Sequence, residues 1–104
     1  MIKVTYYIGM NDKDTLKQEL SKTDFVLEFD RLFRDYTIYE AQGRFTNRLG
    51  ETTFERSLVV TTFIDDCTAP TLRQHVQHNC SILKDKLNQE TILVEVTKPE
   101  VMFL

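Results

Sequence analysis

The sequence has no tryptophan and contains only three glycines, two prolines and two cysteines in its 104 residues. We find no linker, internal repeat or low-complexity segment, and a chain of this length can bury a core without disulfides. No apolar run approaches the roughly 20 residues of a membrane span. The start, MIKVTYYIGM, lacks the charged segment and the cleavage site of a signal peptide. These absences predict a cytoplasmic protein without membrane contact.

An excess of positive charge is also missing. The chain carries 13 basic and 16 acidic residues, which gives a formal net charge of −3. Without a positive field for phosphates, direct binding of nucleic acid is disfavoured. Apolar residues make up 41% of the chain and include seven phenylalanines and four tyrosines. This composition predicts one globular domain that spans residues 1–104.

Alternating apolar and polar residues predict a strand over residues 2–8. Stretches rich in β-branched and aromatic residues predict strands over residues 36–45 and 52–64, and a last strand is expected over residues 91–97. Asn47 and Gly50 lie between the second and third of these and indicate a hairpin.

Helical periodicity predicts two helices. The first is expected near residues 22–35, after a capping signal formed by Ser21 and Asp24. The second is expected to run from Pro70 to about Asn88. The order of elements is therefore β-α-β-β-α-β, which is the ferredoxin-like α+β pattern, with a four-stranded antiparallel sheet and two helices on one face.

The segment DDCTAPTLRQHVQHNC holds both cysteines and both histidines. On a helix that turns roughly 100° per residue, Cys80 points about 140° away from His75 and about 160° away from His78, so one zinc ion cannot bind all three. Cys67 lies roughly 16 Å from Cys80 along that helix, which is too far for a disulfide. We therefore interpret Cys80 as a core residue and predict neither a metal nor another cofactor.

One face of the sheet is not covered by helices, and we predict that it binds a partner or a ligand. By alternation we place on it the side chains Tyr7, Glu40, Gln42, Arg44 and Glu55. Glu40 and Glu55 would then meet near Arg44. A catalytic carboxylate pair needs a pocket that separates the two pKa values, and an open sheet does not supply one. No catalytic residue is assigned, so enzyme activity is disfavoured.

Three stretches, YYIGMNDKDT, IYEAQGRF and GETTFERSLVV, resemble a group of small ferredoxin-like proteins of bacterial plasmids, prophages and phages. The resemblance covers about the first 60 residues apart from the first helix, and Met10 replaces the usual leucine. The matching positions are Gly9, Asn11, Asp12, Lys13, Gly43, Gly50 and Glu55. The resemblance implies an origin in a mobile element and brings no activity with it.

The apolar end of the sequence, Val101, Met102, Phe103 and Leu104, is expected to dock on the domain itself or on a partner. Our leading hypothesis is a non-enzymatic protein that works through protein contacts, with a host protein or a second copy as partner. It would inhibit a host defence or nucleic-acid enzyme such as a CRISPR effector. One alternative is a dimeric α+β barrel that encloses a small molecule, with Tyr7, Arg44, Glu40 and Glu55 lining the pocket. The other is an assembly subunit.

Overall fold

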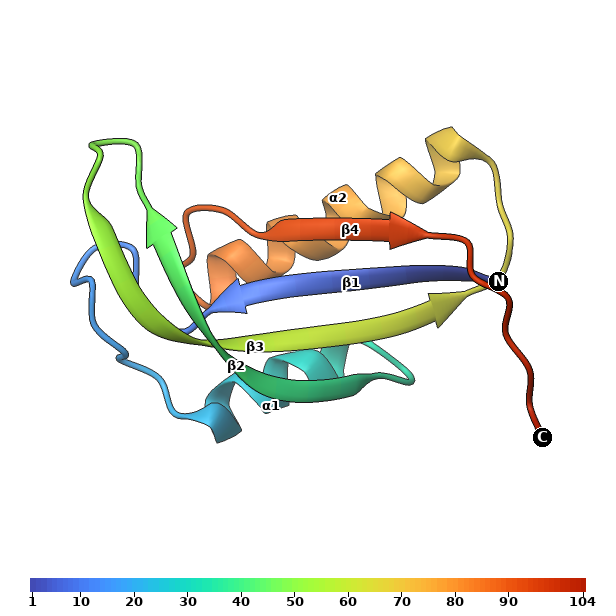
Figure 1. Ribbon diagram of the computed structural model, residues 1–104, viewed down its shortest axis with the longest axis horizontal. Helices are drawn as coiled ribbons and strands as arrows, with labels where there is room; N and C mark the ends of the chain where they lie inside the picture. Colours follow the sequence, from blue (N-terminus) through green and yellow to red (C-terminus); the bar gives the residue numbers. More distant parts are fainter.

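A four-stranded antiparallel sheet, in the order β2-β3-β1-β4, forms the body of the protein (Figure 1). A computed structural model describes residues 1–104, all of the chain. The strands are β1 (Ile2–Gly9), β2 (Thr37–Thr46), β3 (Thr52–Ile64) and β4 (Leu93–Thr97). β1 lies in the interior of the sheet, whereas β2 and β4 are its two edges.

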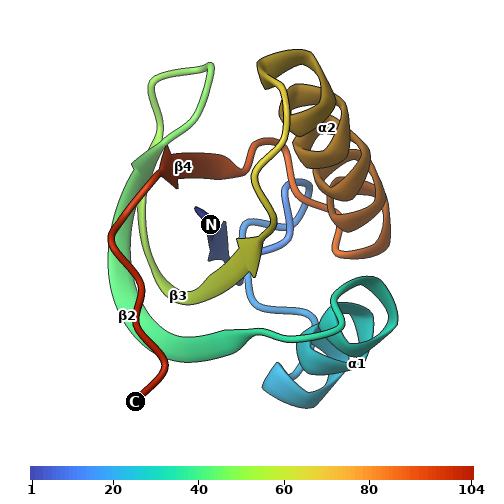
Figure 2. The same ribbon diagram turned by 90° about the vertical axis from the view of Figure 1, so that its right-hand side faces the viewer.

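Two helices cover one face of this sheet (Figure 2). α1 (Lys22–Leu32) begins with a capping box, in which the Ser21 hydroxyl accepts from the Asp24 N–H and the Asp24 carboxylate accepts from the Ser21 N–H. α2 (Ala69–Lys86) is capped by Thr68. The order of elements confirms the predicted ferredoxin-like α+β fold. Neither helix is long and apolar enough to cross a membrane.

The core lies between the helices and the side chains that β1 turns toward them. Tyr6, in the middle of β1, is fully buried, and its ring centroid lies 5.2 Å from that of Phe33. Its hydroxyl accepts a hydrogen bond from the Asn79 side chain of α2 at 3.0 Å. Because a buried hydroxyl without a partner is costly, this contact lets an aromatic residue with a polar end occupy the centre of the core. The sequence had not pointed to Asn79 as a core residue.

Three element ends differ from the prediction by two residues or more. α1 stops at Leu32, three residues early, because the backbone of Phe33 is already extended, with φ −111° and ψ 134°. Phe33 still reaches the core from that position. α2 ends at Lys86, and Asn88 adopts a positive φ of 49°, which turns the chain back toward the sheet. β4 begins at Leu93, two residues late.

The β2–β3 hairpin extends beyond the body of the sheet and places the functional site. Figure 1 shows it running past the Gly9 end of β1 and turning toward the β4 side. At its tip the Asn47 side chain accepts hydrogen bonds from the backbone N–H groups of Leu49 and Glu51, and Gly50 has a φ of 79°. The hairpin, the Gly9 end of β1 and the loop before β4 therefore surround a common space.

We expect Phe29→Ala to destabilise the protein by about 3–5 kcal/mol, because Phe29 is fully buried and the change leaves a cavity. Leu27→Ala is the matched control, since Leu27 lies on the same helix and its side chain is 48% exposed. It should cost less than about 1 kcal/mol. Urea unfolding followed by circular dichroism measures both. Equal losses for the two variants would contradict the packing of α1.

Candidate ligand-binding site

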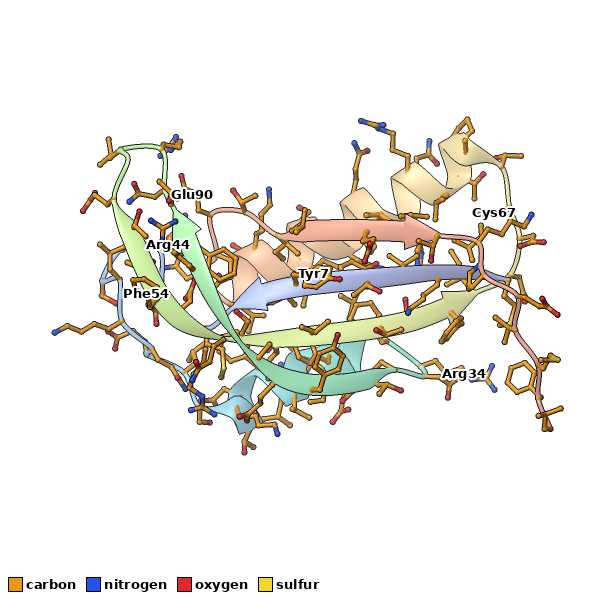
Figure 3. The ribbon with its side chains drawn as sticks, in the orientation of Figure 1. Tyr7, Arg34, Arg44, Phe54, Cys67 and Glu90 are labelled. Atoms are coloured by element: carbon orange, nitrogen blue, oxygen red, sulfur yellow. The ribbon has the colours of Figure 1, made fainter.

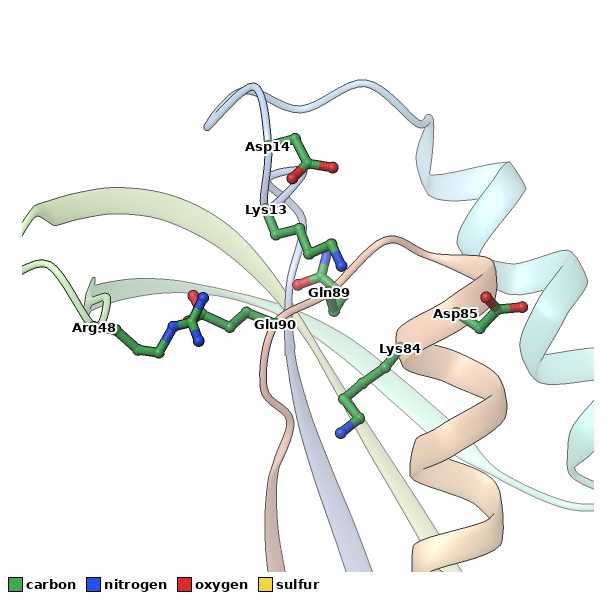
Figure 4. A pocket seen from close by; sticks show the side chains of 7 residues that line it. All are labelled: Lys13, Asp14, Arg48, Lys84, Asp85, Gln89 and Glu90. Atoms are coloured by element: carbon green, nitrogen blue, oxygen red, sulfur yellow. The ribbon is translucent and has the colours of Figure 1, made fainter.

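Two neighbouring cavities lie at the base of the hairpin. One, of about 300 Å³, reaches the open sheet face, and the other, of about 450 Å³, lies beside the end of α2. They share Lys13, Arg48, Gln89 and Glu90. Volumes of this order are typical of small-molecule sites. The larger of the two cavities, beside the end of α2, is lined by polar side chains alone (Figure 4).

The carboxylate of Glu55 lies in the smaller cavity, directly over Gly9. A Cβ atom at residue 9 would collide with this carboxylate, so only glycine leaves room for it. Its Oε2 accepts a hydrogen bond from the backbone N–H of Asn11 at 2.6 Å. Burial raises the pKa of Glu55 above its ordinary value, and the Asn11 hydrogen bond opposes part of that rise. The site thus holds a half-buried carboxylate with no cation paired to it.

The sheet side of the same cavity carries apolar and aromatic groups. Tyr7 and Leu93 are neighbours across β1 and β4, and Phe45 reaches in from β2. The Tyr7 hydroxyl donates to Glu95 at 2.8 Å, and this bond raises the pKa of Tyr7. Figure 3 shows Tyr7 near the middle of the open face. A flat, partly apolar ligand could therefore stack here beside a negative charge.

A buried hydroxyl group, that of Ser57, lies near Phe45. The Phe45 ring occupies the space above Gly43, where a Cβ atom would meet it. The hydroxyl of Ser57 lies in the same region, is buried and has no hydrogen-bond partner. A buried hydroxyl without a partner costs about 1–3 kcal/mol. Such groups are rare in folded proteins.

Hydrogen bonds join the loop after β1 to the end of α2. The Asn88 side chain donates to Asp12 at 2.8 Å and to Asp14 at 2.9 Å, and the Asn88 carbonyl accepts from the Lys13 N–H at 3.0 Å. The Asn88 hydrogen bond is the main cause that lowers the pKa of Asp12. The buried side chain of Gln89 donates to the Asn11 carbonyl at 3.0 Å. These contacts fix the loop that carries Lys13 at the mouth of the site.

Charged side chains of both signs line the two cavities. Arg48, from the hairpin, pairs with Glu90, from the loop before β4, at 2.7 Å (Figure 4). In total three cations and five acidic groups are present: Lys13, Arg48 and Lys84 against Asp12, Asp14, Glu55, Asp85 and Glu90. This mixture suits a ligand that is itself zwitterionic and carries a net positive charge. No three histidine, cysteine or carboxylate side chains converge in a way that could hold a metal ion.

Of the residues predicted on the open sheet face, the structure brings Tyr7 and Glu55 together in the cavity. The placement of Glu40, Gln42 and Arg44 on that face was wrong. Ile38 pairs with the core residue Val60, so these alternate residues of β2 lie on the helix side. Glu40 binds Lys22 at the start of α1 and Arg56 of β3, at 3.3 and 3.0 Å.

The mixed side chains on both faces of β2 explain why Glu40, Gln42 and Arg44 were placed on the wrong face. Both faces of β2 mix apolar and polar side chains, so alternation alone did not fix which face is buried. The face opposite Glu40 carries Tyr39 and Phe45 instead. Arg44 lies over the ring of Phe54 in the hairpin, 5.9 Å from its centroid, away from Glu55 (Figure 3). The predicted meeting of Glu40 and Glu55 therefore does not occur.

Sequence reasoning also missed Lys13, Arg48, Gln89 and Glu90 as site residues. A signal for part of the site was present in the resemblance described above. Its matching positions Gly9, Asn11, Asp12, Lys13 and Glu55 all line the smaller cavity. The predicted contact residues Val101, Met102, Phe103 and Leu104 form no part of the site, since they leave the opposite end of the sheet (Figure 1).

The fold has counterparts among solved structures. A phage SAM lyase in the apo state superposes with a TM-score of 0.75 at 18% identity, over 92% of this chain and 78% of the other. The phage SAM lyase in complex with S-methyl-5′-thioadenosine gives a TM-score of 0.71 at 18% identity, over 93% and 80%. The periplasmic divalent cation tolerance protein CutA of Archaeoglobus fulgidus gives 0.57 at 14% identity, over 99% and 88%.

At such identities these likenesses show a shared fold alone. No protein-family model matches the chain, and no curated protein matches it. The protein is thus a small α+β protein with the architecture found in phage SAM lyase and in CutA. What it binds must be argued from its own side chains.

We expect Glu55 to make stability fall as the pH rises above about 4.5. Its pKa is raised in the folded state, so the folded protein holds this proton more tightly than the unfolded chain does. Between the unfolded and the folded pKa, each rise in pH therefore costs stability. In Glu55→Gln this loss should disappear, and the variant should gain stability relative to the wild type from pH 4.5 to 7. Urea midpoints measured across this range test the difference, and parallel curves would contradict the burial of Glu55.

Proposed function

We propose that the protein binds S-adenosylmethionine at these two neighbouring cavities and cleaves it, with release of S-methyl-5′-thioadenosine. The observation that carries this proposal is the half-buried carboxylate of Glu55, which has no paired cation and lies beside aromatic side chains in a small-molecule-sized cavity. The likeness to phage SAM lyase, bound to S-methyl-5′-thioadenosine in one structure, supports this choice of ligand. The mobile-element origin that the sequence resemblance implies belongs to the same proposal.

The chemistry of this ligand matches the lining in three parts. Its sulfonium is a cation that a carboxylate in a partly dry site attracts more strongly than in water, and Glu55 supplies that carboxylate. The adenine ring of its adenosine part is flat and aromatic, which suits stacking on Tyr7 and Phe45. Its amino-acid part carries an ammonium and a carboxylate, which suits the mixed charges around Lys13 and Glu90.

The cleavage requires little from the protein beyond orientation and shielding. When the bond between sulfur and the amino-acid chain breaks, its electron pair goes to sulfur, and S-methyl-5′-thioadenosine leaves as a neutral thioether. The fragment's own carboxylate oxygen bonds to the carbon that sulfur leaves and closes a lactone, so no external co-reactant is consumed. The site residues would hold the chain in the reactive geometry and limit the access of water.

Contact with another protein is the second candidate function. It is favoured by apolar side chains that the hairpin exposes, above all Leu49 and Phe54, which are 82% and 79% exposed. The predicted inhibition of a host defence or nucleic-acid enzyme stays a prediction, since none of the comparisons bears on it. An α+β barrel closed by a second copy likewise stays a prediction.

To test the proposed activity, the purified protein is incubated with S-adenosylmethionine, and S-methyl-5′-thioadenosine is quantified by liquid chromatography against a buffer blank. We expect release above the blank. Glu55→Gln should weaken binding of S-adenosylmethionine, measured by calorimetry, about 10- to 100-fold, because it removes the coulombic attraction between the carboxylate and the sulfonium, and each tenfold step corresponds to about 1.4 kcal/mol. Gly9→Ala should weaken it too, because the added Cβ displaces the Glu55 carboxylate.

Glu40→Gln is the matched control. Glu40 is also a glutamate of the β2–β3 pair, but it lies on the helix side in ion pairs with Lys22 and Arg56. Its loss should leave the binding of S-adenosylmethionine unchanged. A wild-type protein that neither binds S-adenosylmethionine nor forms the thioether would overturn the proposal. Equal losses for Glu40→Gln and Glu55→Gln would remove Glu55 from the site.

A further inference from the structure

An apolar groove lies between α2 and β4, at the end of the molecule away from the hairpin. Its volume is about 640 Å³, and its apolar lining includes Leu72 and Val76 of α2 and Val94 and Val96 of β4. These residues are only partly buried, and Val96 is 44% exposed. The groove shares no lining residue with the ligand site.

The strand beside this groove is an open edge. β4 pairs with β1 on one side, and no strand pairs with its other side. An open edge strand next to an apolar groove is suited to an added extended segment, which pairs through its backbone and places every second side chain in the groove.

The segment after β4 supplies apolar side chains that nothing covers. Residues 98–104 have no regular structure. Met102 is 69% exposed, Phe103 is 87% exposed, and Leu104 is wholly exposed. Three neighbouring side chains of this kind form an apolar surface that water solvates poorly, and such surfaces are typical of contacts with another protein.

The start of this tail is held away from its own groove. Lys98 pairs with Asp66 of the β3–α2 loop at 3.4 Å, and Asp66 also binds the amino group of Met1 at 3.2 Å. Figures 1 and 2 show the tail leaving β4 on the side of the sheet opposite α2. To reach its own groove, the tail would have to reverse direction directly after Thr97 and break the Lys98 pair.

We propose that residues 101–104 of one copy dock in the groove between α2 and β4 of a second copy. In an extended segment Met102 and Leu104 point to the same side, with the spacing of Val94 and Val96 on β4. The groove carries Arg73, and the tail carries Glu100, and neither takes part in an ion pair within the chain. The side-chain spacing, the apolar character and the charge of the two segments are therefore complementary.

This contact joins two different surfaces, so each copy can give a tail and receive one. Such a heterologous contact closes into a ring or continues as a chain of copies. It is independent of the ligand site, and its presence or absence leaves the proposed cleavage of S-adenosylmethionine untouched.

Cysteine cross-linking tests which chain supplies the tail. In a Cys67→Ser, Cys80→Ala background, one variant carries Leu104→Cys and a second carries Gln77→Cys, in the groove. We expect disulfide-linked dimers when the two variants are mixed and oxidised. A chain that carries both changes should not close on itself when it is dilute. Closure within one chain, or no cross-link in the mixture, would overturn the proposal.

Solution mass gives a second test that does not depend on new cysteines. Light scattering should show a concentration-dependent oligomer for the wild type and a monomer after deletion of residues 101–104. Leu49→Ser is the matched control, because it removes an equally exposed apolar side chain from the hairpin, and it should keep the oligomer. Arg73→Glu should weaken the oligomer, and Glu100→Arg in the same chain should restore it. A monomeric wild type, or an oligomer that survives the deletion, would overturn the proposal.

Discussion

The fold and the site both depend on the alternation of side chains along the central strand. On one face β1 turns Val4, Tyr6 and Ile8 into the core, where all three are fully buried. On the other face it presents Tyr7 and Gly9 to the cavity. Because a strand cannot shift by one residue without exchanging its two faces, burial of the core side fixes the position of the site residues as well.

Around that strand, the site is formed by segments that are distant in the sequence. Hydrogen bonds of Asn88 join the loop after β1 to the end of α2, and the ion pair of Arg48 and Glu90 joins the hairpin to the loop before β4. The buried polar contacts of Gln89 need defined partners, so they hold these loops in one arrangement. A small protein thereby obtains a defined cavity at the edge of an otherwise open sheet face.

The shared architecture of phage SAM lyase and CutA shows that this fold serves more than one purpose. This chain places a carboxylate over a glycine, next to aromatic rings and charges of both signs. The proposed ligand is argued from that chemistry. The tail and the α2–β4 groove lie at the other end of the molecule, so ligand binding and assembly use separate surfaces.

The sequence by itself determined the order of the elements, the Ser21 cap and the core face of β1, because periodicity and capping depend on neighbouring residues. It did not determine which face of β2 is buried, since both faces carry mixed side chains. The hairpin register that pairs Ile38 with Val60 decided this and moved Glu40 away from Glu55. Only the tertiary structure brought Glu55 over Gly9 and placed Lys13, Arg48 and Glu90 beside it, because these contacts join residues whose distance in space no local pattern records.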